Sequence, residues 1–123
     1  MPYKKIGTGF SVSTKEDVEG TLVVIESIDD VIELIQGEAE GKICYIEQAG
    51  ATTLGPILSR ITAIICETGS SGSHLAIVSR EYEIPAFMSA KLEYDLKNLN
   101  GKRVKMHTVE DGDRGEVFLW EDS

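Results

Sequence analysis

A histidine that directly follows a run of glycine and serine is the part of the sequence best suited to chemistry. His74 opens a helix-like pattern, and the run before it reads Gly69-Ser70-Ser71-Gly72-Ser73. A neutral imidazole, with an unperturbed pKa of about 6.5, keeps a nucleophilic nitrogen lone pair at neutral pH. Free backbone N–H groups and the helix dipole favour an anion at the start of a helix. The pattern predicts a phosphate-binding loop with His74 as nucleophile; its alternative is a histidine that only caps the helix or packs against it.

Other motifs fall short of known sites because of their spacing. Residues 37–43 are one residue short of a nucleotide-binding P-loop and have no hydroxyl after Lys42, so they predict a helix end and a turn. A serine-hydrolase elbow would need glycine at position 73, which is serine. Cys44 and Cys66 have neither the Cys-x-x-Cys spacing nor a nearby histidine for a zinc site. We expect both cysteines to be buried, reduced thiols and the chain to hold no metal.

The charge and length of the chain restrict its partners. It has 123 residues and a net charge of −9 at pH 7. Nucleic acids and anionic membranes bind clusters of Lys and Arg, so this composition predicts neither as a partner. No apolar run approaches the roughly 20 residues of a membrane span, and the first residues do not resemble a signal peptide. We expect one cytoplasmic domain over residues 1–123 that shares its chemistry with a partner, since two catalytic domains would not fit.

Strand and helix patterns alternate on both sides of the glycine and serine run. Short β-branched runs predict strands, and apolar residues at helical spacing predict helices between them. The predicted strands are 21–25, 42–46, 63–66, 85–88, 102–107 and 116–120, and the predicted helices are 31–35, 51–60, 73–82 and 92–99. An Asp-Gly pair between the last two strands favours a hairpin. The alternation predicts an α/β layered domain that ends in a C-terminal antiparallel hairpin.

The segment from Gly69 to Phe87 resembles the signature around the phosphorylated histidine in a known family of domains. This family is the mobile, or swivelling, domain of phosphoenolpyruvate-utilising enzymes such as phosphoenolpyruvate synthase, pyruvate phosphate dikinase and rifampicin phosphotransferase. The residues that agree with the signature are Gly69, Ser73, His74, Ala76, Ile77, Val78, Arg80, Glu81, Ile84, Pro85 and Ala86. Residues 63–66, 99–104 and 112–117 extend the likeness. The chain departs from the signature at Ser70, where a second glycine is common, and at Gly72, where many members have threonine.

The resemblance implies a fold of the swivelling β/β/α type and a role as a free-standing phosphocarrier subunit. His74 would accept a phosphoryl group on a ring nitrogen, and Gly69, Ser70, Ser71, Gly72 and Ser73 would bind it. The carrier would shuttle between an ATP-grasp type nucleotide-binding partner and a second module that binds pyruvate or phosphoenolpyruvate. No cofactor would stay bound to this chain, and Mg²⁺ with ATP or phosphoenolpyruvate would occupy the partners. Arg80 and Glu81 would act in docking or packing.

Two functions from other classes remain open at this point. One is a non-phosphorylated swivelling subunit of an aconitase-like dehydratase, in which the serine-rich loop binds substrate over the active site of a partner. The other is a binding module that senses phosphate without forming a covalent adduct. Replacement of His74 separates these functions, because only the carrier depends on a nucleophilic nitrogen at that position.

Overall fold

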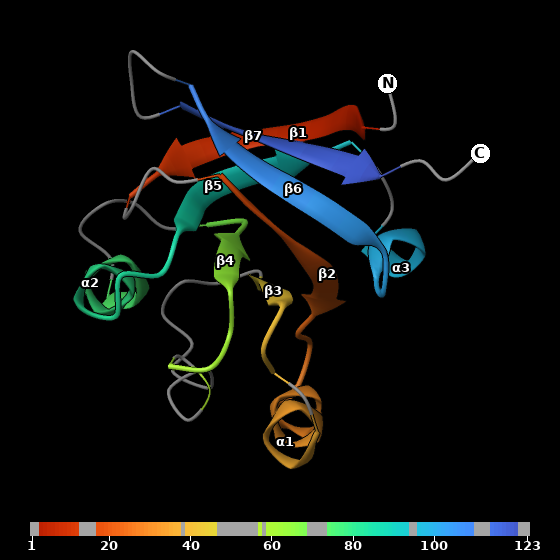
Figure 1. The fold of residues 1–123 in the computed structure, drawn as a ribbon, viewed down its shortest axis with the longest axis vertical. Coiled ribbons are helices and arrows are strands. Elements are labelled where there is room, and N and C mark those ends of the chain that lie inside the picture. Colours follow the sequence, from red (N-terminus) through yellow and green to blue (C-terminus); the bar gives the residue numbers. More distant parts are fainter. Residues whose placement is uncertain are drawn as a thin grey trace.

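One mixed sheet with flanking helices makes up the part of the chain that the computed structural model describes, which is residues 3–12, 17–37, 39–46, 57, 59–68, 74–93, 96–109 and 114–120 (Figure 1). The strands within these residues are β1 (Tyr3–Ser11), β2 (Val18–Val24), β3 (Lys42–Ile46), β4 (Ala63–Cys66), β5 (Ala86–Leu92), β6 (Arg103–Thr108) and β7 (Arg114–Trp120). The helices are α1 (Ile28–Gln36), α2 (His74–Glu81) and α3 (Leu96–Leu99). The predicted α/β class is confirmed.

The strands close into a barrel in the order β1-β5-β4-β3-β2-β6-β7, and β7 returns to β1. The strands β2, β3, β4 and β5 are parallel neighbours, and every other pairing is antiparallel. The predicted C-terminal pair is confirmed, with Val104 opposite Leu119 and Thr108 opposite Gly115. The closed barrel differs from the expected layered domain. The reason is β1, which pairs with both β5 and β7 and so joins what would otherwise be two sheet edges.

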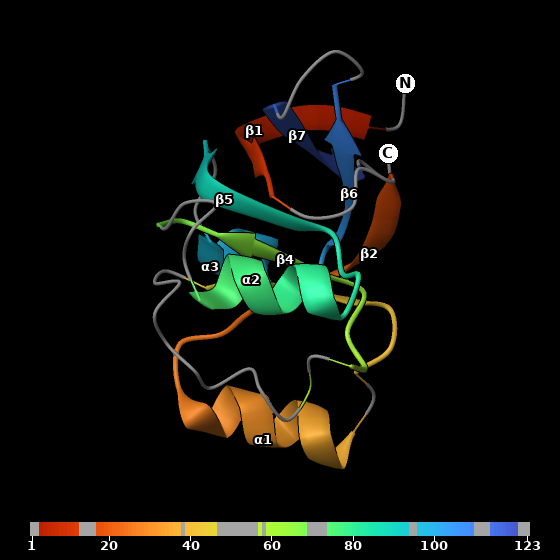
Figure 2. The same ribbon diagram turned by 90° about the vertical axis from the view of Figure 1, so that its left-hand side faces the viewer.

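Two hydrophobic cores lie on the two faces of the parallel strands, because successive side chains of a strand point to opposite faces. The barrel core includes Ile43 and Tyr45 of β3, and the helix-side core includes Cys44 and Ile46 of the same strand. All four residues of β4 are buried, as is typical of parallel strands that are covered on both faces. Figure 2 shows α1 and α2 on one side of these strands and β1, β6 and β7 on the far side.

The helix α1 is fixed at its two ends by side chains. At its start, Asp30 Oδ2 accepts hydrogen bonds from the backbone N–H groups of Glu26 at 2.8 Å and Ser27 at 3.1 Å. Free N–H groups at a helix start need such acceptors. Val31 and Leu34 enter the helix-side core, at the spacing of one helical face. This confirms the helix predicted over 31–35 and its end near Gly37.

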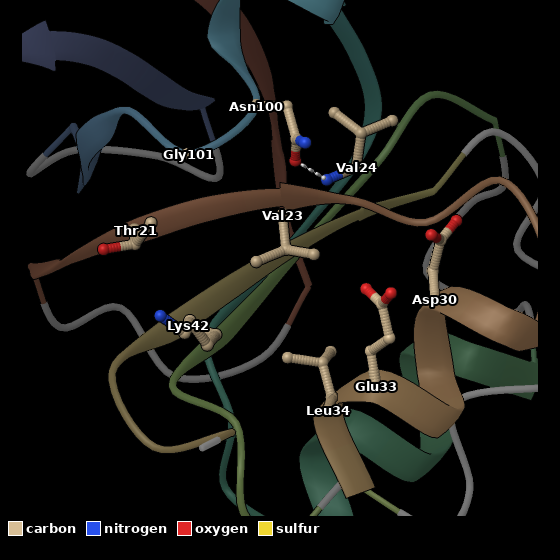
Figure 3. A pocket seen from close by; sticks show the side chains of 9 residues that line it. All are labelled: Thr21, Val23, Val24, Asp30, Glu33, Leu34, Lys42, Asn100 and Gly101. Atoms are coloured by element: carbon tan, nitrogen blue, oxygen red, sulfur yellow. Dashed lines mark hydrogen bonds between the residues drawn. The ribbon is translucent and has the colours of Figure 1, made fainter. Parts of the chain in front are cut away.

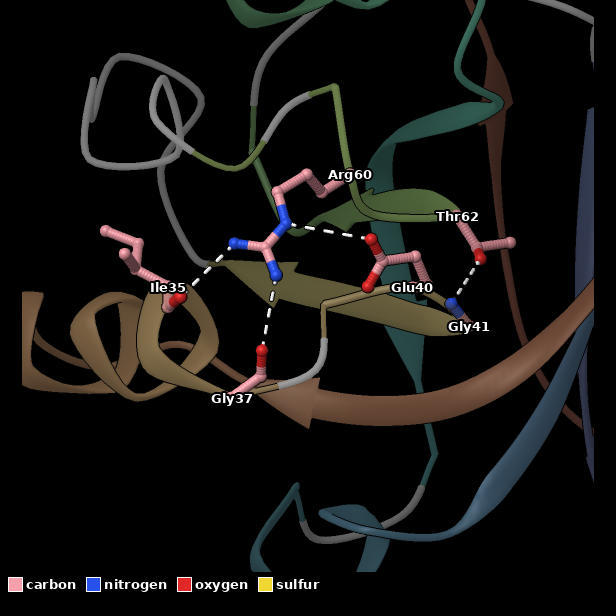
Figure 4. A network of polar contacts seen from close by, with 6 residues as sticks. All are labelled: Ile35, Gly37, Glu40, Gly41, Arg60 and Thr62. Carbon is pink, nitrogen blue, oxygen red and sulfur yellow. Dashed lines mark hydrogen bonds and ion pairs between the residues drawn. The ribbon is translucent and has the colours of Figure 1, made fainter.

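Arg60 holds the other end of α1 (Figure 4). Its Nη1 donates to the carbonyl of Ile35 at 3.3 Å, and its Nη2 donates to that of Gly37 at 3.2 Å. The Glu40 carboxylate lies 3.7 Å from Nε. A cation at the carboxyl end of a helix meets the negative end of its dipole and the carbonyls left without helical partners. The guanidinium therefore joins α1 to the chain that leads into β4.

The remaining predicted elements differ from the structure in three ways. The strand β1 was not predicted, the predicted helix over 92–99 is only α3, and Leu92 belongs to β5. Most of the helix predicted over 51–60 lies outside the described residues. Among the described helices, none combines the length and the apolar content that a bilayer span requires.

Candidate functional site

His74 is the first residue of α2, the helix that connects the parallel strands β4 and β5. The chain leaves the sheet at Cys66, the carboxyl end of β4, and returns at Ala86 after the helix. In open α/β sheets, ligands bind beyond the carboxyl ends of parallel strands, where helix N-termini gather. The backbone of His74 therefore lies where the sequence predicts it, at a helix start beyond such a strand. The predicted ligand-binding residues 69–73 lie outside the described part of the chain.

The buried and exposed residues of α2 follow its helical period. Ala76 and Ser79 are fully buried against the sheet, whereas Ile77 and Glu81 are exposed. At 3.6 residues per turn, position 74 lies about 60° from position 77 and about 20° from position 81 around the helix axis. It lies about 140° or more from the two buried positions. In backbone register, position 74 therefore lies nearer to positions 77 and 81 than to positions 76 and 79.

The body of α2 is attached to the sheet through its buried face and its last turn. Ala76 is part of the helix-side core, together with Ile64, Cys66 and Met88, and Val78 packs against that core. After the helix, the Ile84 N–H donates to the Ser79 carbonyl at 2.9 Å. These contacts make α2 a rigid support for the residue at its start.

Arg80 and Glu81, the predicted docking residues, have different surroundings. Arg80 Nε donates to the Val12 carbonyl at 2.7 Å, which attaches the last turn of α2 to the chain that follows β1. Glu81 is exposed at the end of the helix. Arg80 therefore has a packing role, and docking by either residue stays a prediction.

The two residues that follow β4, Glu67 and Thr68, are held by hydrogen bonds from the sheet. Cys66 Sγ donates to the Thr68 carbonyl at 2.8 Å, and the Tyr45 hydroxyl donates to Glu67 Oε2 at 3.2 Å. Burial raises the pKa of the Cys66 thiol, and it raises that of Cys44 to about 12. Both cysteines are buried and free, as predicted. They are neutral thiols at pH 7 and contribute packing.

A hollow of about 340 Å³ lies between α1, the C-terminal half of β2 and the turn after α3 (Figure 3). Val23 and Leu34 form its apolar part, and Glu33 and Lys42 carry opposite charges on its lining. Asn100 Oδ1 accepts from the Val24 N–H at 2.9 Å, which satisfies β2 where it no longer pairs with β6. None of the predicted site residues within the described part of the chain lines this hollow. The sequence does not reveal it, because its lining comes from segments far apart along the chain.

Comparisons with solved structures give likenesses of fold. Comparison with curated proteins gave no match. A muramoyltetrapeptide carboxypeptidase from Oxalobacter formigenes superposes with a TM-score of 0.59 and 14% identity, over 98% of this chain and 51% of its own. The structure titled N-terminal domain of Enzyme 1 - Nitrogen gives a TM-score of 0.50 and 22% identity, over 73% of this chain and 35% of its own. These likenesses concern the fold alone, and this chain spans about half and about a third of those two chains.

The match that concerns the family covers the site. The family model described as PEP-utilising enzyme, mobile domain, matches residues 38–114, which is more than half of the chain. The matched segment contains β3, β4, α2 and β5, and so both His74 and the strands that position it. This chain belongs to the family of the mobile domain of phosphoenolpyruvate-utilising enzymes.

Proposed function

We propose that this chain is a phosphohistidine carrier of a phosphotransferase, with His74 as the residue that accepts and releases the phosphoryl group. The observation that carries the proposal is the position of His74 as the first residue of α2, inside the segment that matches the family. A mobile domain is one part of a larger enzyme, which implies partner domains. The chain could supply this part within a longer protein or as a separate subunit.

The start of a helix suits both chemical states of such a histidine. The empty imidazole must be neutral to attack, and the positive end of the helix dipole opposes its protonation. The phosphorylated ring carries negative charge, which the same dipole favours by about 0.3 to 1 kcal/mol at an exposed site. Position 74 is therefore electrostatically suitable before and after the transfer.

The transfer is a substitution at phosphorus. A bond forms between a ring nitrogen of His74 and the phosphorus of the donor, and the bond from phosphorus to the leaving oxygen breaks with its electrons on that oxygen. In the second half-reaction the N–P bond breaks and its electrons return to the imidazole. This chain supplies the nitrogen and the N–H groups of the helix start. The partners would supply Mg²⁺, the basic residues, and ATP or phosphoenolpyruvate: one partner of the ATP-grasp type and one that binds pyruvate or phosphoenolpyruvate.

The packing of the helices against the sheet supports a domain that moves as a unit, as a swivelling domain does. The helices α1 and α2 cover one side of the parallel strands, and β1, β6 and β7 lie on the other (Figure 2). Because α2 is packed into the helix-side core, the histidine would be carried by rigid-body motion of the domain rather than by movement of the helix.

The test is covalent labelling of the full chain, first with phosphoramidate as a small phosphoryl donor and then with candidate partners and labelled ATP or phosphoenolpyruvate. The chain has two histidines, so His107→Ala is a matched control. His107 lies in β6 with its Nδ1 2.8 Å from Asp17 Oδ1, on a side chain that is 40% exposed. We expect acid-labile, base-stable label in the wild type and in His107→Ala, and none in His74→Ala.

Label retained in His74→Ala would reject the proposal. Reversible phosphate binding without any adduct would point instead to a phosphate-sensing module. A dehydratase subunit would keep its function in His74→Ala.

A further inference from the structure

A second hollow, of about 510 Å³, lies over the antiparallel strands β5, β1 and β7, away from the residues discussed so far. We call it the basic hollow; its lining residues are Lys5, Gly7, Thr8, Lys91, Glu93 and Arg114. Three of these six residues are cations, one from each strand, on a chain whose net charge is −9. Such a concentration of positive charge on an acidic chain identifies a surface for an anion.

Two irregularities in β1 shape this surface. The pairing of β1 with β7 shifts register between Lys5 and Gly7, and its pairing with β5 shifts between Thr8 and Phe10. On the β5 side, Ser89 has a φ of 52°, in the left-handed region that non-glycine residues rarely adopt. Register shifts of this kind bend a strand, redirect its side chains and are frequent beside functional sites. The two shifts bracket Gly7 and Thr8, which line the hollow.

The cations of the basic hollow differ in how far they are neutralised. Lys5 Nζ lies 2.7 Å from Glu116 Oε2, so this cation already has a carboxylate partner. Within the described part of the chain, neither Lys91 nor Arg114 forms an ion pair. Thr8 pairs with Lys91 of β5, and Phe10 pairs with Arg114 of β7. These two cations therefore flank β1 from opposite sides, two strand spacings apart across the sheet and two residues apart along β1, which puts their Cα positions about 12 Å apart.

The opposite end of the hollow is negative. Glu93 lines it there, and its backbone N–H donates to the Ile6 carbonyl at 2.7 Å, which places it near Lys5 rather than near Phe10. Glu116 of β7 lies opposite Thr8, and the pKa of its carboxyl is lowered by its hydrogen bond to Lys5 and by the charges of Lys5, Arg114 and His107. The Thr8 end of the hollow thus has a net positive charge, because Lys91 and Arg114 outnumber Glu116 there, and the other end has the Glu93 carboxylate as an acceptor.

We propose that the basic hollow is a reversible binding site for a small phosphate monoester, with the phosphate between Lys91 and Arg114 and the hydroxyl-bearing remainder toward Glu93. A phosphate suits Lys91 and Arg114, which outnumber the Glu116 carboxylate opposite Thr8, and a guanidinium fork with an ammonium is a common donor set for it. The Thr8 hydroxyl adds a donor on the floor between them. Glu93 favours a neutral hydroxyl over a second anionic group. This site forms no covalent bond and does not involve His74, so it is independent of the carrier function.

Solution NMR of the full chain tests the proposal, with titrations of inorganic phosphate and of glycerol 3-phosphate at constant ionic strength and chloride as the reference anion. We expect saturable shifts of the Gly7, Thr8 and Lys91 amides, with tighter binding of the ester than of inorganic phosphate. Lys91→Gln and Arg114→Gln should each weaken binding several-fold, and the double variant at least tenfold. Glu93→Gln should keep or tighten phosphate binding. The matched control is Lys102→Gln, at an exposed lysine outside the hollow, which should leave the affinity within twofold.

Three results would overturn the proposal: chloride producing the same shifts, the double variant binding as tightly as the wild type, or Lys102→Gln weakening binding as much as Lys91→Gln. Inorganic phosphate binding as tightly as the ester would also overturn it, because the negative end would then contribute nothing. Thr8→Val provides a check that does not change the charge, and it should weaken binding. His74→Ala should bind the ester normally, which separates failure of this site from failure of the carrier function.

Discussion

The Nε atom of Arg80 donates a 2.7 Å hydrogen bond to the carbonyl oxygen of Val12, a residue 68 positions earlier in the chain. This contact joins the helix that begins at His74 to the end of β1, the strand that closes the barrel. Val12 is a buried residue, and buried backbone carbonyls need a hydrogen-bond donor, which Arg80 supplies here. The support of the candidate site and the closure of the barrel therefore meet in one hydrogen bond.

Replacing Arg80 with alanine should destabilise the fold. A hydrogen bond to a charged group contributes about 1.5 to 3 kcal/mol. Because the Arg80 side chain is partly exposed, we expect a loss of about 1 to 2 kcal/mol in the free energy of unfolding, measured by urea denaturation. Lys102→Ala, at an exposed position, should change it by less than about 0.5 kcal/mol. Equal effects of the two changes would contradict the structural role of Arg80.

Replacing Ser11 with alanine should leave the fold as stable or make it more stable. The side chain is only 5% exposed, and its Oγ has no hydrogen-bond partner among the described residues. A buried hydroxyl without a partner keeps its desolvation cost, so its removal should raise the free energy of unfolding by 0 to about 1 kcal/mol. Ser79 is fully buried and does have an interaction partner. Ser79→Ala should therefore lower the free energy of unfolding. A loss of more than about 1 kcal/mol in Ser11→Ala would show that the hydroxyl has a partner in solution.

The sequence predicts the parallel half of the sheet well and the closing strand not at all. Residues 43–46 and 63–66 are all apolar and include four isoleucines, as is typical of strands that are buried on both faces. By contrast, β1 contains two lysines and two glycines, which are depleted in strands. A Cβ atom at Gly7 would overlap the Leu92 side chain and the Lys91 carbonyl. Glycine is needed there because β5 approaches closely, and only the tertiary structure shows this.

The same distinction applies to the site. The position of His74 at a helix start is readable because the loop pattern and the helix pattern are adjacent in the sequence. The contact between Arg80 and Val12 has no local signal, since the partner is a backbone carbonyl far along the chain. The basic hollow is equally hidden, because strand pairing brings Lys5, Lys91 and Arg114 together from three distant segments.

Replacing Asp30 with alanine should loosen the start of α1. Its Oδ2 accepts the N–H groups of Glu26 and Ser27, and loss of such a cap costs about 0.5 to 2 kcal/mol. Glu33→Ala is the matched control on the same helix, since Glu33 is exposed and forms no ion pair among the described residues. We expect Asp30→Ala to lower the free energy of unfolding by about 1 kcal/mol and to speed hydrogen exchange in the first turn of α1. Both effects should be absent in Glu33→Ala; equal exchange rates in the two variants would show that the carboxylate does not cap the helix.

The stability of the fold should fall in alkaline solution partly because of Cys44. Burial in β3 raises the pKa of its thiol from an ordinary 9.0 to about 12. Between these values the folded chain keeps a proton that the unfolded chain releases, so stabilisation present below pH 9 is lost as the pH rises towards 12. One proton corresponds to about 1.4 kcal/mol per pH unit. The measurement is urea unfolding of the wild type and of Cys44→Ala at pH 8 to 11. Above pH 9, the free energy of unfolding should decline less steeply with pH in Cys44→Ala than in the wild type. The two slopes should differ by up to about 1.4 kcal/mol per pH unit. Parallel declines would mean that the thiol ionises as readily in the folded chain as in the unfolded one. The slope separates this effect from the packing lost with the sulfur atom, because the packing loss lowers stability equally at every pH.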